Sequence, residues 1–518
     1  MDDRLAGALG LLPGYGAQHI VLSMTALALG IAISLPLAVL ASQRPRLRFA
    51  ALAVASLVQT IPGLALLALF YPLLLALSAL TTRLFGFGVP ALGFLPSLLA
   101  LTIYSMLPIL RNGVTALIGV DPAYVEAADG VGMTPRQRLY RVELPLAAPV
   151  IMAGIRTAAV WTIGMATLST AVGQTSLGNF IFSGLQTENW IYVLTGCIAV
   201  VILALLVDQV LGLIESGAVR RDGRRIAVGL AALLFGTATA GASLLRGPAA
   251  DYVLGAKNFS EQYILAGLMA ERIAKGGHTA ARKEGLGSAV IFRALAGNEI
   301  DAYVDYSGTL WTNVMARSDV PPRAVMLEEL TRFMRERYGV TVLGALGFEN
   351  AYTLAMRGER AGALGPHTIA DLTPLAPRLA LGSDLEFLSR PEWAALRNTY
   401  GLAFGQEKSF NPTFMYRALQ DGLVDVISAF SSDGRLAGNA LVTLEDVKHA
   451  IPSYDAVILI APKRANDEVL RGALAPLIGA IPVETMRQAN FMLDRDTDKA
   501  SLADAVQFLA GSLKSPAQ

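Results

Sequence analysis

Six apolar stretches in the first half of the chain constrain its fold more than any other feature. They lie at residues 18–42, 48–80, 92–113, 146–172, 189–215 and 226–246, and each is long enough to cross about 30 Å of hydrocarbon. The second is too long for one upright helix. Its Pro62-Gly63 and Tyr71-Pro72 pairs predict a kinked crossing with an extra interfacial or re-entrant turn. The sequence therefore predicts an all-α polytopic membrane domain of about six transmembrane helices in contact with lipid.

Charge divides the chain into two dissimilar halves. Residues 1–248 contain 15 arginines, no lysine and 10 acids, whereas the remaining 270 residues contain 27 basic and 31 acidic side chains. The second half is thus about twice as rich in charge and has the composition of a water-soluble fold. We expect the membrane domain to span 1–247 and a soluble domain to span 248–518. The overall charge of +1 is a cancellation and gives no reason to expect a nucleic-acid partner.

Arginine clusters at residues 44–48, 136–141 and 220–225 predict the orientation, because short loops rich in Lys and Arg stay in the cytoplasm. Six crossings place all three clusters inside, and the N-terminus and everything after about residue 247 outside. The segment 226–246, with Ala238-Thr239-Ala240 near its end, also has the features of an internal signal peptide. We expect a retained anchor, and cleavage is the alternative.

The cytoplasmic loop at 121–145 predicts two short helices joined by a turn. Asp121 before Pro122 provides an N-cap and a proline at the first helical position. Gly132 is suited to end that helix in a left-handed conformation, and Thr134 with Gln137 has capping-box spacing for a second helix. We name this segment the elbow.

The elbow also carries a longer pattern: Glu-Ala-Ala, three residues, Gly, nine residues, an aliphatic residue, one residue, Leu-Pro. Every position is met, by Glu126, Ala127, Ala128, Gly132, Val142, Leu144 and Pro145. The pattern resembles the loop of permease subunits of ABC importers. That resemblance implies the binding-protein-dependent permease fold, a homodimer of this chain, and docking of Glu126, Ala127, Ala128 and Gly132 on a separate ATPase present in two copies.

The sequence itself offers no catalytic machinery. It contains no Gly-x4-Gly-Lys-[Ser/Thr] loop for ATP phosphates. Cys197 is the single cysteine, and the four histidines are scattered without ligand spacing. We therefore expect no enzyme activity, cofactor or metal on this chain, and ATP hydrolysis on a different polypeptide.

Short apolar runs alternate with helical stretches in the second half and predict α/β layers. The expected strands are 252–255, 301–304, 341–343, 378–382, 424–430 and 456–460. A clamp for a small molecule needs a cleft that closes, so two lobes are expected. Lobe one is placed at about 250–345 and 453–518, and lobe two at about 346–452.

Seven motifs in this half, in order along the chain, resemble the periplasmic binding proteins for glycine betaine, choline and related quaternary amines. They are Gly255–Tyr263, Asp301–Thr309, Phe348–Tyr352, Gly382–Asp384, Arg390-Pro391, Phe430–Arg435 and Ile451–Asp455. A permease fused to such a domain is a known arrangement of the family. The resemblance therefore implies one chain that combines an ABC importer permease with its two-lobed periplasmic-binding-protein domain.

The same resemblance implies the ligand site. Tyr306, Tyr352, Phe430 and Tyr454 would surround a trimethylammonium group, which has no hydrogen to donate and is recognised by aromatic faces. Lys257, Arg390 and the Thr309 hydroxyl would donate hydrogen bonds to the carboxylate of a betaine. Phe430 stands where tyrosine is usual in the family. Phe259 and Trp311 are assigned to packing.

Together these features predict a subunit of an ATP-driven importer for glycine betaine or a related quaternary-ammonium osmolyte. It would lie in the bacterial inner membrane with its C-terminal domain periplasmic or extracellular. Choline, carnitine and ergothioneine are alternative cargoes. From a different class, a ligand sensor with a membrane anchor is the remaining alternative.

Overall fold

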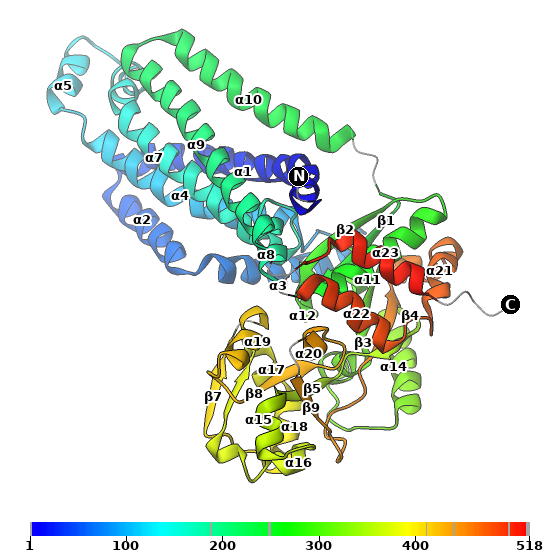
Figure 1. The fold of residues 1–518 in the computed structure, drawn as a ribbon. Helices are drawn as coiled ribbons and strands as arrows, with labels where there is room; N and C mark the ends of the chain where they lie inside the picture. The colour runs from blue at the N-terminus through cyan, green and yellow to red at the C-terminus, as the bar shows by residue number, and fades with distance from the viewer. Residues whose placement is uncertain are drawn as a thin grey trace. The chain divides into compact units, whose positions relative to one another are not determined.

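The chain forms two compact units in a computed structural model that describes residues 3–86, 88–186, 189–246, 250–410, 412–438, 441–495 and 498–513. The first unit comprises residues 1–182 and 191–249, and the second comprises 183–190 and 250–518. The expected boundary between residues 247 and 248 lies outside the described residues. Each unit is described by itself below (Figure 1).

The first unit is all-α in its described part. Six helical segments are long and apolar enough to cross a membrane, namely Leu5–Gln43, Gly63–Phe85, Phe94–Ile118, Pro135–Val172, Trp190–Arg220 and Gly223–Leu245. The expected number of transmembrane helices is confirmed. The larger helices are α1 (Asp3–Gln43), α2 (Pro45–Thr60), α3 (Gly63–Phe85), α4 (Phe94–Ile118), α7 (Leu144–Ala166), α9 (Trp190–Arg220) and α10 (Gly223–Arg246), with a 3-10 turn at Thr167–Val172 and the short α8 (Gly178–Gln186) between α7 and α9.

The long apolar stretch at 48–80 forms two helices that are separated at Pro62-Gly63, as predicted. Helix α2 ends at Thr60, Pro62 is the N-cap of α3, and α2 has no buried residue. The expected break at Tyr71-Pro72 is wrong, because α3 continues through Pro72. One proline in a helix removes a single backbone hydrogen bond, and the buried Tyr71 keeps this turn packed against the unit.

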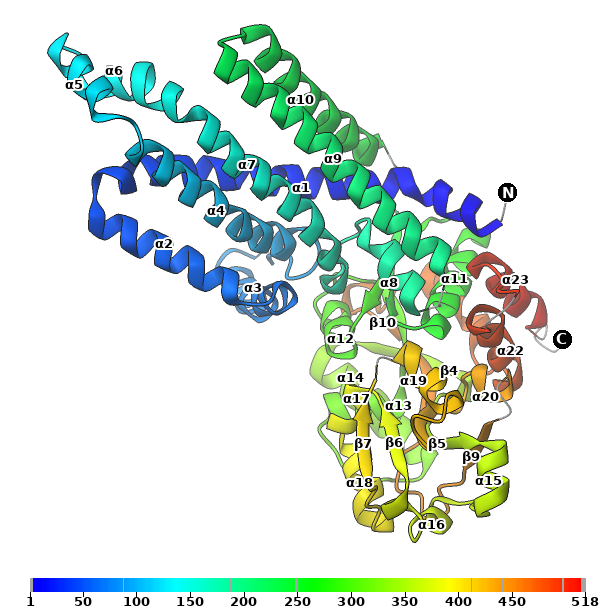
Figure 2. The same ribbon diagram turned by 60° about the vertical axis from the view of Figure 1, so that its left-hand side comes forward.

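Helix α4 packs against both α1 and α7 (Figure 2). Small residues lie where the backbones come closest: a Cβ on Gly154 of α7 would lie 2.8 Å from the Pro108 carbonyl oxygen of α4, and a Cβ on Gly113 would lie 2.9 Å from Ala38 of α1. Close backbone approach of this kind stabilises helix pairs in membranes, where burial of apolar surface supplies little free energy.

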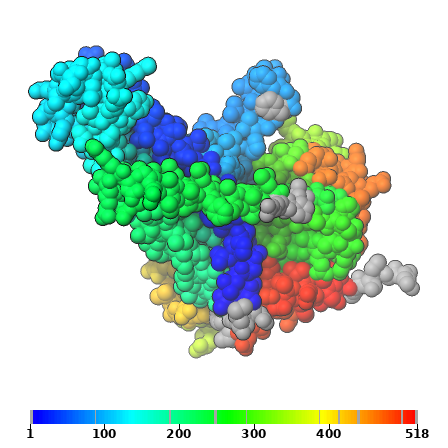
Figure 3. Space-filling view, turned by 90° about the horizontal axis from the view of Figure 1, so that it is seen from above, coloured from blue at the N-terminus to red at the C-terminus, as the bar shows by residue number. Residues whose placement is uncertain are grey.

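The elbow has the predicted form. It consists of α5 (Pro122–Gly130), α6 (Pro135–Arg138) and a π-helical turn at Leu139–Glu143 that leads into α7. Asp121 accepts a hydrogen bond from the Ala123 amide, Thr134 and Gln137 form the capping box, and Gly132 has φ +78°. The guanidinium of Arg138 ties the segment together by pairing with Asp129 and Glu143. In the space-filling view the elbow protrudes from one end of the helical bundle (Figure 3).

The second unit contains two five-stranded mixed sheets. Sheet one has the order β2 (Ala280–Leu286), β1 (Tyr252–Lys257), β3 (Ala302–Tyr306), β10 (Asp455–Ile460), β4 (Thr341–Glu349), and sheet two has the order β7 (Gln406–Ser409), β6 (Ala380–Ser383), β8 (Val426–Phe430), β5 (Tyr352–Arg357), β9 (Leu441–Leu444). The expected lobe boundary at 345 falls inside β4, so the chain first passes between the sheets at about residue 350. It returns just before β10, close to the expected residue 453.

Helices cover these sheets. They are α11 (Ser260–Lys275), α12 (Ser288–Ala296), α13 (Ser307–Thr309), α14 (Arg323–Tyr338), α15 (Gly358–Leu364), α16 (Ile369–Leu372), α17 (Leu385–Ser389), α18 (Pro391–Tyr400), α19 (Pro412–Gln420), α20 (Arg435–Gly438), α21 (Glu468–Leu474), α22 (Val483–Asp494) and α23 (Leu502–Ser512). The two-lobed α/β architecture predicted for this half is confirmed.

Candidate ligand-binding site

The register of two strand pairs brings four aromatic side chains together. Tyr306 is the last residue of β3, and Tyr454 immediately precedes its antiparallel partner β10, in which Ala456 lies opposite Tyr306. In sheet two, Tyr352 is the first residue of β5 and lies opposite Phe430, the last residue of β8. Each lobe therefore presents an aromatic pair at the carboxyl end of one of its strands, the edge at which α/β sheets bind ligands.

These rings meet across the cleft between the lobes. The Tyr352 ring centroid lies 4.6 Å from that of Phe430 and 5.8 Å from that of Tyr454, with the two tyrosines edge to face. Phe259 joins them, with its centroid 6.2 Å from Tyr306 and 6.3 Å from Phe430. Phe259 was expected only to pack in the core, but it lines the pocket. Trp311, also assigned to packing, is fully buried.

Lys257 reaches the pocket already paired with an acid. Its Nζ lies 2.5 Å from Asp305 and 5.1 Å from the ring centroid of Tyr306. The Asp305 carboxylate also accepts hydrogen bonds from the Tyr303 hydroxyl and the Tyr306 amide. Both charged groups are buried, so each depends on the other to offset its loss of hydration.

Arg390 is held in the same way by Glu392. Its Nη2 donates to Glu392 at 3.0 Å and reaches the Thr309 hydroxyl at 3.5 Å. Glu392 also accepts from the hydroxyls of Tyr454 and Thr312 in lobe one. Burial raises the pKa of Glu392, but the hydrogen bonds and charge of Arg390 outweigh burial and hold that pKa below its usual value. Glu392 is therefore an ionised link between the lobes, and the sequence reasoning missed it.

All seven residues assigned to the ligand by resemblance line a single pocket: Lys257, Tyr306, Thr309, Tyr352, Arg390, Phe430 and Tyr454. Further lining residues were not assigned a role, and all of them are polar or charged. These are Asn258, Ser260, Ser288, Asp384, Ser432, Asp433, Arg435 and Asp494. Several of these residues belong to the seven motifs and directly follow a strand. That position after a strand could have identified them as lining residues.

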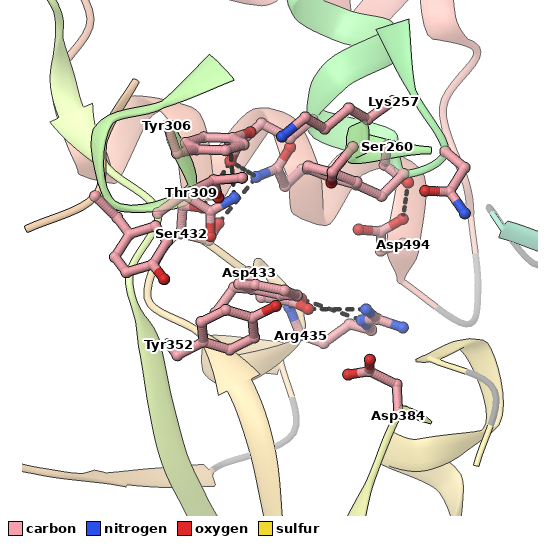
Figure 4. A pocket seen from close by; sticks show the side chains of 18 of the residues that line it. Lys257, Ser260, Tyr306, Thr309, Tyr352, Asp384, Ser432, Asp433, Arg435 and Asp494 are labelled. Atoms are coloured by element: carbon pink, nitrogen blue, oxygen red, sulfur yellow. Dashed lines mark hydrogen bonds and ion pairs between the residues drawn. The ribbon is translucent and has the colours of Figure 1, made fainter. Parts of the chain in front are cut away.

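At the polar end, Arg435 pairs with Asp433 at 2.8 Å (Figure 4). Asp494 accepts a hydrogen bond from the Ser260 hydroxyl, and burial raises the pKa of Asp494 to about 6. Asp384 lies at this end as well, away from Tyr306. The pocket is therefore aromatic at one end and charged at the other.

Glu261 connects the lobes beneath the rings. It is buried, and it accepts hydrogen bonds from Tyr306 and Asn490 of lobe one and from Ser432 of lobe two. Asn350, at the passage between the sheets, also donates to it. Burial raises the pKa of Glu261 despite these donors. The Glu261 carboxyl therefore holds both the Tyr306 ring and Asn350, the residue at which the chain passes from one sheet to the other.

The aromatic lining of the pocket favours a ligand with a permanent positive charge. Its three lining cations, Lys257, Arg390 and Arg435, are each paired with an acid. The four rings assigned to the ligand line the same pocket. Aromatic faces attract a quaternary ammonium group.

An α-helical membrane unit followed by a two-lobed unit with an aromatic cleft defines a transporter that carries its own ligand receptor. Residues 30–220 match the binding-protein-dependent transport system inner membrane components, and residues 250–510 match the substrate-binding domain of ABC-type glycine betaine transport systems. The chain belongs to this importer family as a permease fused to its substrate-binding domain. It is located in the inner membrane with the substrate-binding domain outside the cytoplasm.

Individual relatives match one or both units. The ergothioneine transport permease/ergothioneine binding protein EgtU of Helicobacter pylori (strain G27) is 28% identical over 86% of this chain and 80% of its own length. The choline transport system permease protein OpuBB of Bacillus subtilis (strain 168) is 41% identical over 38% of this chain and 84% of its own length. A crystal structure of a glycine betaine/carnitine/choline ABC transporter covers 50% of this chain and 96% of its own at 24% identity, with a TM-score of 0.44. The family matches in both halves favour a permease over a membrane-anchored sensor.

Proposed function

We propose that this chain takes up a trimethylammonium zwitterion, of which glycine betaine is the simplest, and that the outer domain binds it in the aromatic pocket. The convergence of aromatic rings from both lobes on one pocket carries this proposal. The ammonium group lies among Tyr306, Tyr352, Phe430 and Tyr454, where each cation–π contact contributes about 0.5–2 kcal/mol. The carboxylate accepts hydrogen bonds from Lys257, Arg390 and Thr309, which are charge-assisted for the two cations.

Ergothioneine, a histidine betaine, is the second candidate cargo. It carries a trimethylammonium group, a carboxylate and a ring with N–H donors, so it needs acceptors beyond an aromatic cage. The polar end of the pocket offers the carboxyl groups of Asp384 and Asp494. A relative that matches both units of this chain is named for ergothioneine.

Calorimetric titration of the purified full-length chain with glycine betaine, choline, carnitine and ergothioneine tests the cargo. We expect binding of at least one zwitterion, and tighter binding of zwitterions than of choline, which has no carboxylate. Asp384→Asn separates the candidates, because it should weaken ergothioneine while leaving glycine betaine nearly unchanged. Binding of amino acids or sugars without any quaternary amine would contradict the proposal.

ATP hydrolysis is assigned to a separate subunit that docks on the elbow, with two copies of each chain in the transporter. Glu126, Ala127 and Gly132 are exposed there, while Ala128 is buried against the turn. Tyr124, Val131 and Tyr140 add exposed apolar surface, and exposed apolar patches of this kind mark protein contacts. The lack of a phosphate-binding loop in the sequence supports the same assignment.

Gly132→Val should uncouple ligand binding from ATP hydrolysis. Gly132 has φ +78°, a conformation that costs a residue with a side chain about 1–2 kcal/mol, so the turn between α5 and α6 should shift. We expect ligand-stimulated hydrolysis in the reconstituted transporter to fall at least about fivefold, with unchanged ligand affinity. Gly130→Ala is the matched control, since Gly130 lies inside α5 with no atom within 4 Å of an added Cβ. Parallel loss of affinity and hydrolysis would point to misfolding instead.

A further inference from the structure

A charged network links two helices inside the membrane unit. Arg156 of α7 pairs with Asp208 of α9 through two hydrogen bonds of 2.8 and 2.7 Å, and its remaining terminal nitrogen donates to Glu215 at 2.8 Å. Gly212 lies between these acids on α9, and a Cβ there would lie 3.5 Å from the guanidinium carbon. The guanidinium is thus held flat against α9.

This network lies on the cytoplasmic side of the membrane unit. Arg156 follows the start of α7 by 12 residues, and Asp208 and Glu215 precede the last residue of α9 by 12 and 5 residues. Both of those helix ends adjoin cytoplasmic arginine clusters. At 1.5 Å per residue, Arg156 and Asp208 lie about 18 Å and Glu215 about 8 Å from these ends. The network therefore extends from near the cytoplasmic boundary into the apolar part of the membrane unit.

The network is neither neutral nor fully buried. One cation faces two carboxylates, and the side chains of Arg156, Asp208 and Glu215 are 33%, 22% and 25% exposed. A charged side chain within a bilayer is costly against lipid and faces protein or a water-filled path. Contact of this face of α7 and α9 with lipid chains is therefore energetically unfavourable, because the face exposes charged side chains.

The same face contains a hollow lined by Ala153, Arg156, Thr157, Val160, Trp161 and Asp208. Trp161 is 57% exposed, and Thr157 lies one turn before it on the same face of α7. Indole is the best aromatic partner for a cation, and the surplus carboxylate adds a negative charge. The hollow thus combines the two features that attract a quaternary ammonium group.

We propose that this hollow is a binding site in the permease for the trimethylammonium group of the cargo on its way across the membrane, a role that rests on the proposed function. Trp161 supplies the aromatic face. Asp208 lines the hollow, Glu215 leaves the network with one negative charge in excess, and Arg156 holds both carboxylates in place.

Cysteine labelling in proteoliposomes that contain the complete transporter tests access to the site. The probe is 2-(trimethylammonium)ethyl methanethiosulfonate, which carries the proposed ligand group. In Thr157→Cys/Cys197→Ser we expect labelling that saturating cargo slows at least about tenfold. The wild-type chain is the matched control, because its single cysteine, the exposed Cys197, lies outside the hollow on α9. Absence of labelling at position 157 would mean that the face contacts lipid, and disulfide formation between copies at this position would mean that a second subunit covers it; either result overturns the site.

Uptake kinetics provide the second test. Glu215→Gln removes the surplus charge but keeps the Arg156–Asp208 pair, and Trp161→Leu removes the aromatic face. For both variants we expect KM for uptake to rise at least about threefold while the affinity of the outer domain stays unchanged. Trp190→Leu is the control, since Trp190 is 55% exposed on α9 and lies outside the hollow. If the wild type transports its trimethylammonium cargo and both variants match it, the site alone is refuted, whereas a wild type that transports no such compound refutes the proposed function.

Discussion

Arg390→Ala is expected to lower the free energy of unfolding of the substrate-binding domain by about 3–5 kcal/mol. The substitution leaves the fully buried Glu392 carboxylate without the cation that holds its pKa down. The hydroxyls of Tyr454 and Thr312 would still donate to it, but no cation among the described residues would. Chemical unfolding of residues 250–518, produced as a separate domain, measures the loss.

The double variant Arg390→Ala/Glu392→Gln distinguishes a lost ion pair from lost packing. It leaves no uncompensated charge, so we expect it to recover at least half of the stability. Ligand preference is then measured in this folded background. Glycine betaine should lose roughly ten- to one-hundred-fold more affinity than choline, because choline has no carboxylate for Arg390 to bind. Equal losses for the two ligands would mean that Arg390 serves only to hold Glu392 and the lobes.

The seven residues that the motifs assigned line one pocket, but the motifs did not predict the charge balance within it. Lys257 and Arg390 were assigned as carboxylate donors from motif positions, and both line the pocket. Their acidic partners, Asp305 and Glu392, depend on which groups are desolvated together, and that follows from tertiary packing. A buried cation can be expected to have a partner, but the sequence does not say which acid it is.

The positions of the aromatic residues in the pocket could also be predicted only in part. The predicted strand at 424–430 ends at Phe430 as observed, whereas the predicted strand at 301–304 stops two residues short of Tyr306. That Tyr454 and Tyr352 lie opposite these positions depends on antiparallel register, and strand β5 was not predicted at all. Strands β2 and β7 were missed because they are edge strands with charged residues, as in Gln406–Ser409, which lack the apolar alternation of an interior strand.

In the membrane unit, composition predicted the crossings well but not the pairing of their charges. Apolar length identified six helices because lipid selects strongly for continuous apolar runs. Asp208 and Glu215 both lie in the apolar stretch at 189–215, but their pairing with Arg156 requires knowing which faces of α7 and α9 are adjacent. The elbow was predicted down to its capping residues, because caps and left-handed glycines are local properties of the chain.

Gly308→Ala should lower ligand affinity strongly, because the added methyl group displaces the Tyr454 ring of the aromatic site. A Cβ on Gly308 would lie 2.5–2.7 Å from three atoms of the Tyr454 ring. That ring has little freedom to move, because its hydroxyl is bound to Glu392 and its edge meets Tyr352. We expect the affinity for every quaternary amine to fall at least about tenfold, or roughly 1.4 kcal/mol, with a loss of stability of about 1–3 kcal/mol from overpacking.

Calorimetry with glycine betaine and choline, together with chemical unfolding, measures both effects. Gly362→Ala is the matched control, since Gly362 lies on the exposed side of α15 with no atom within 4 Å of an added Cβ. It should leave affinity unchanged and stabilise the helix slightly. Because the displaced ring serves the cation that both ligands share, the two affinities should fall in parallel. A loss confined to glycine betaine would instead place Tyr454 at the carboxylate, and unchanged affinity for both would remove its ring from the site.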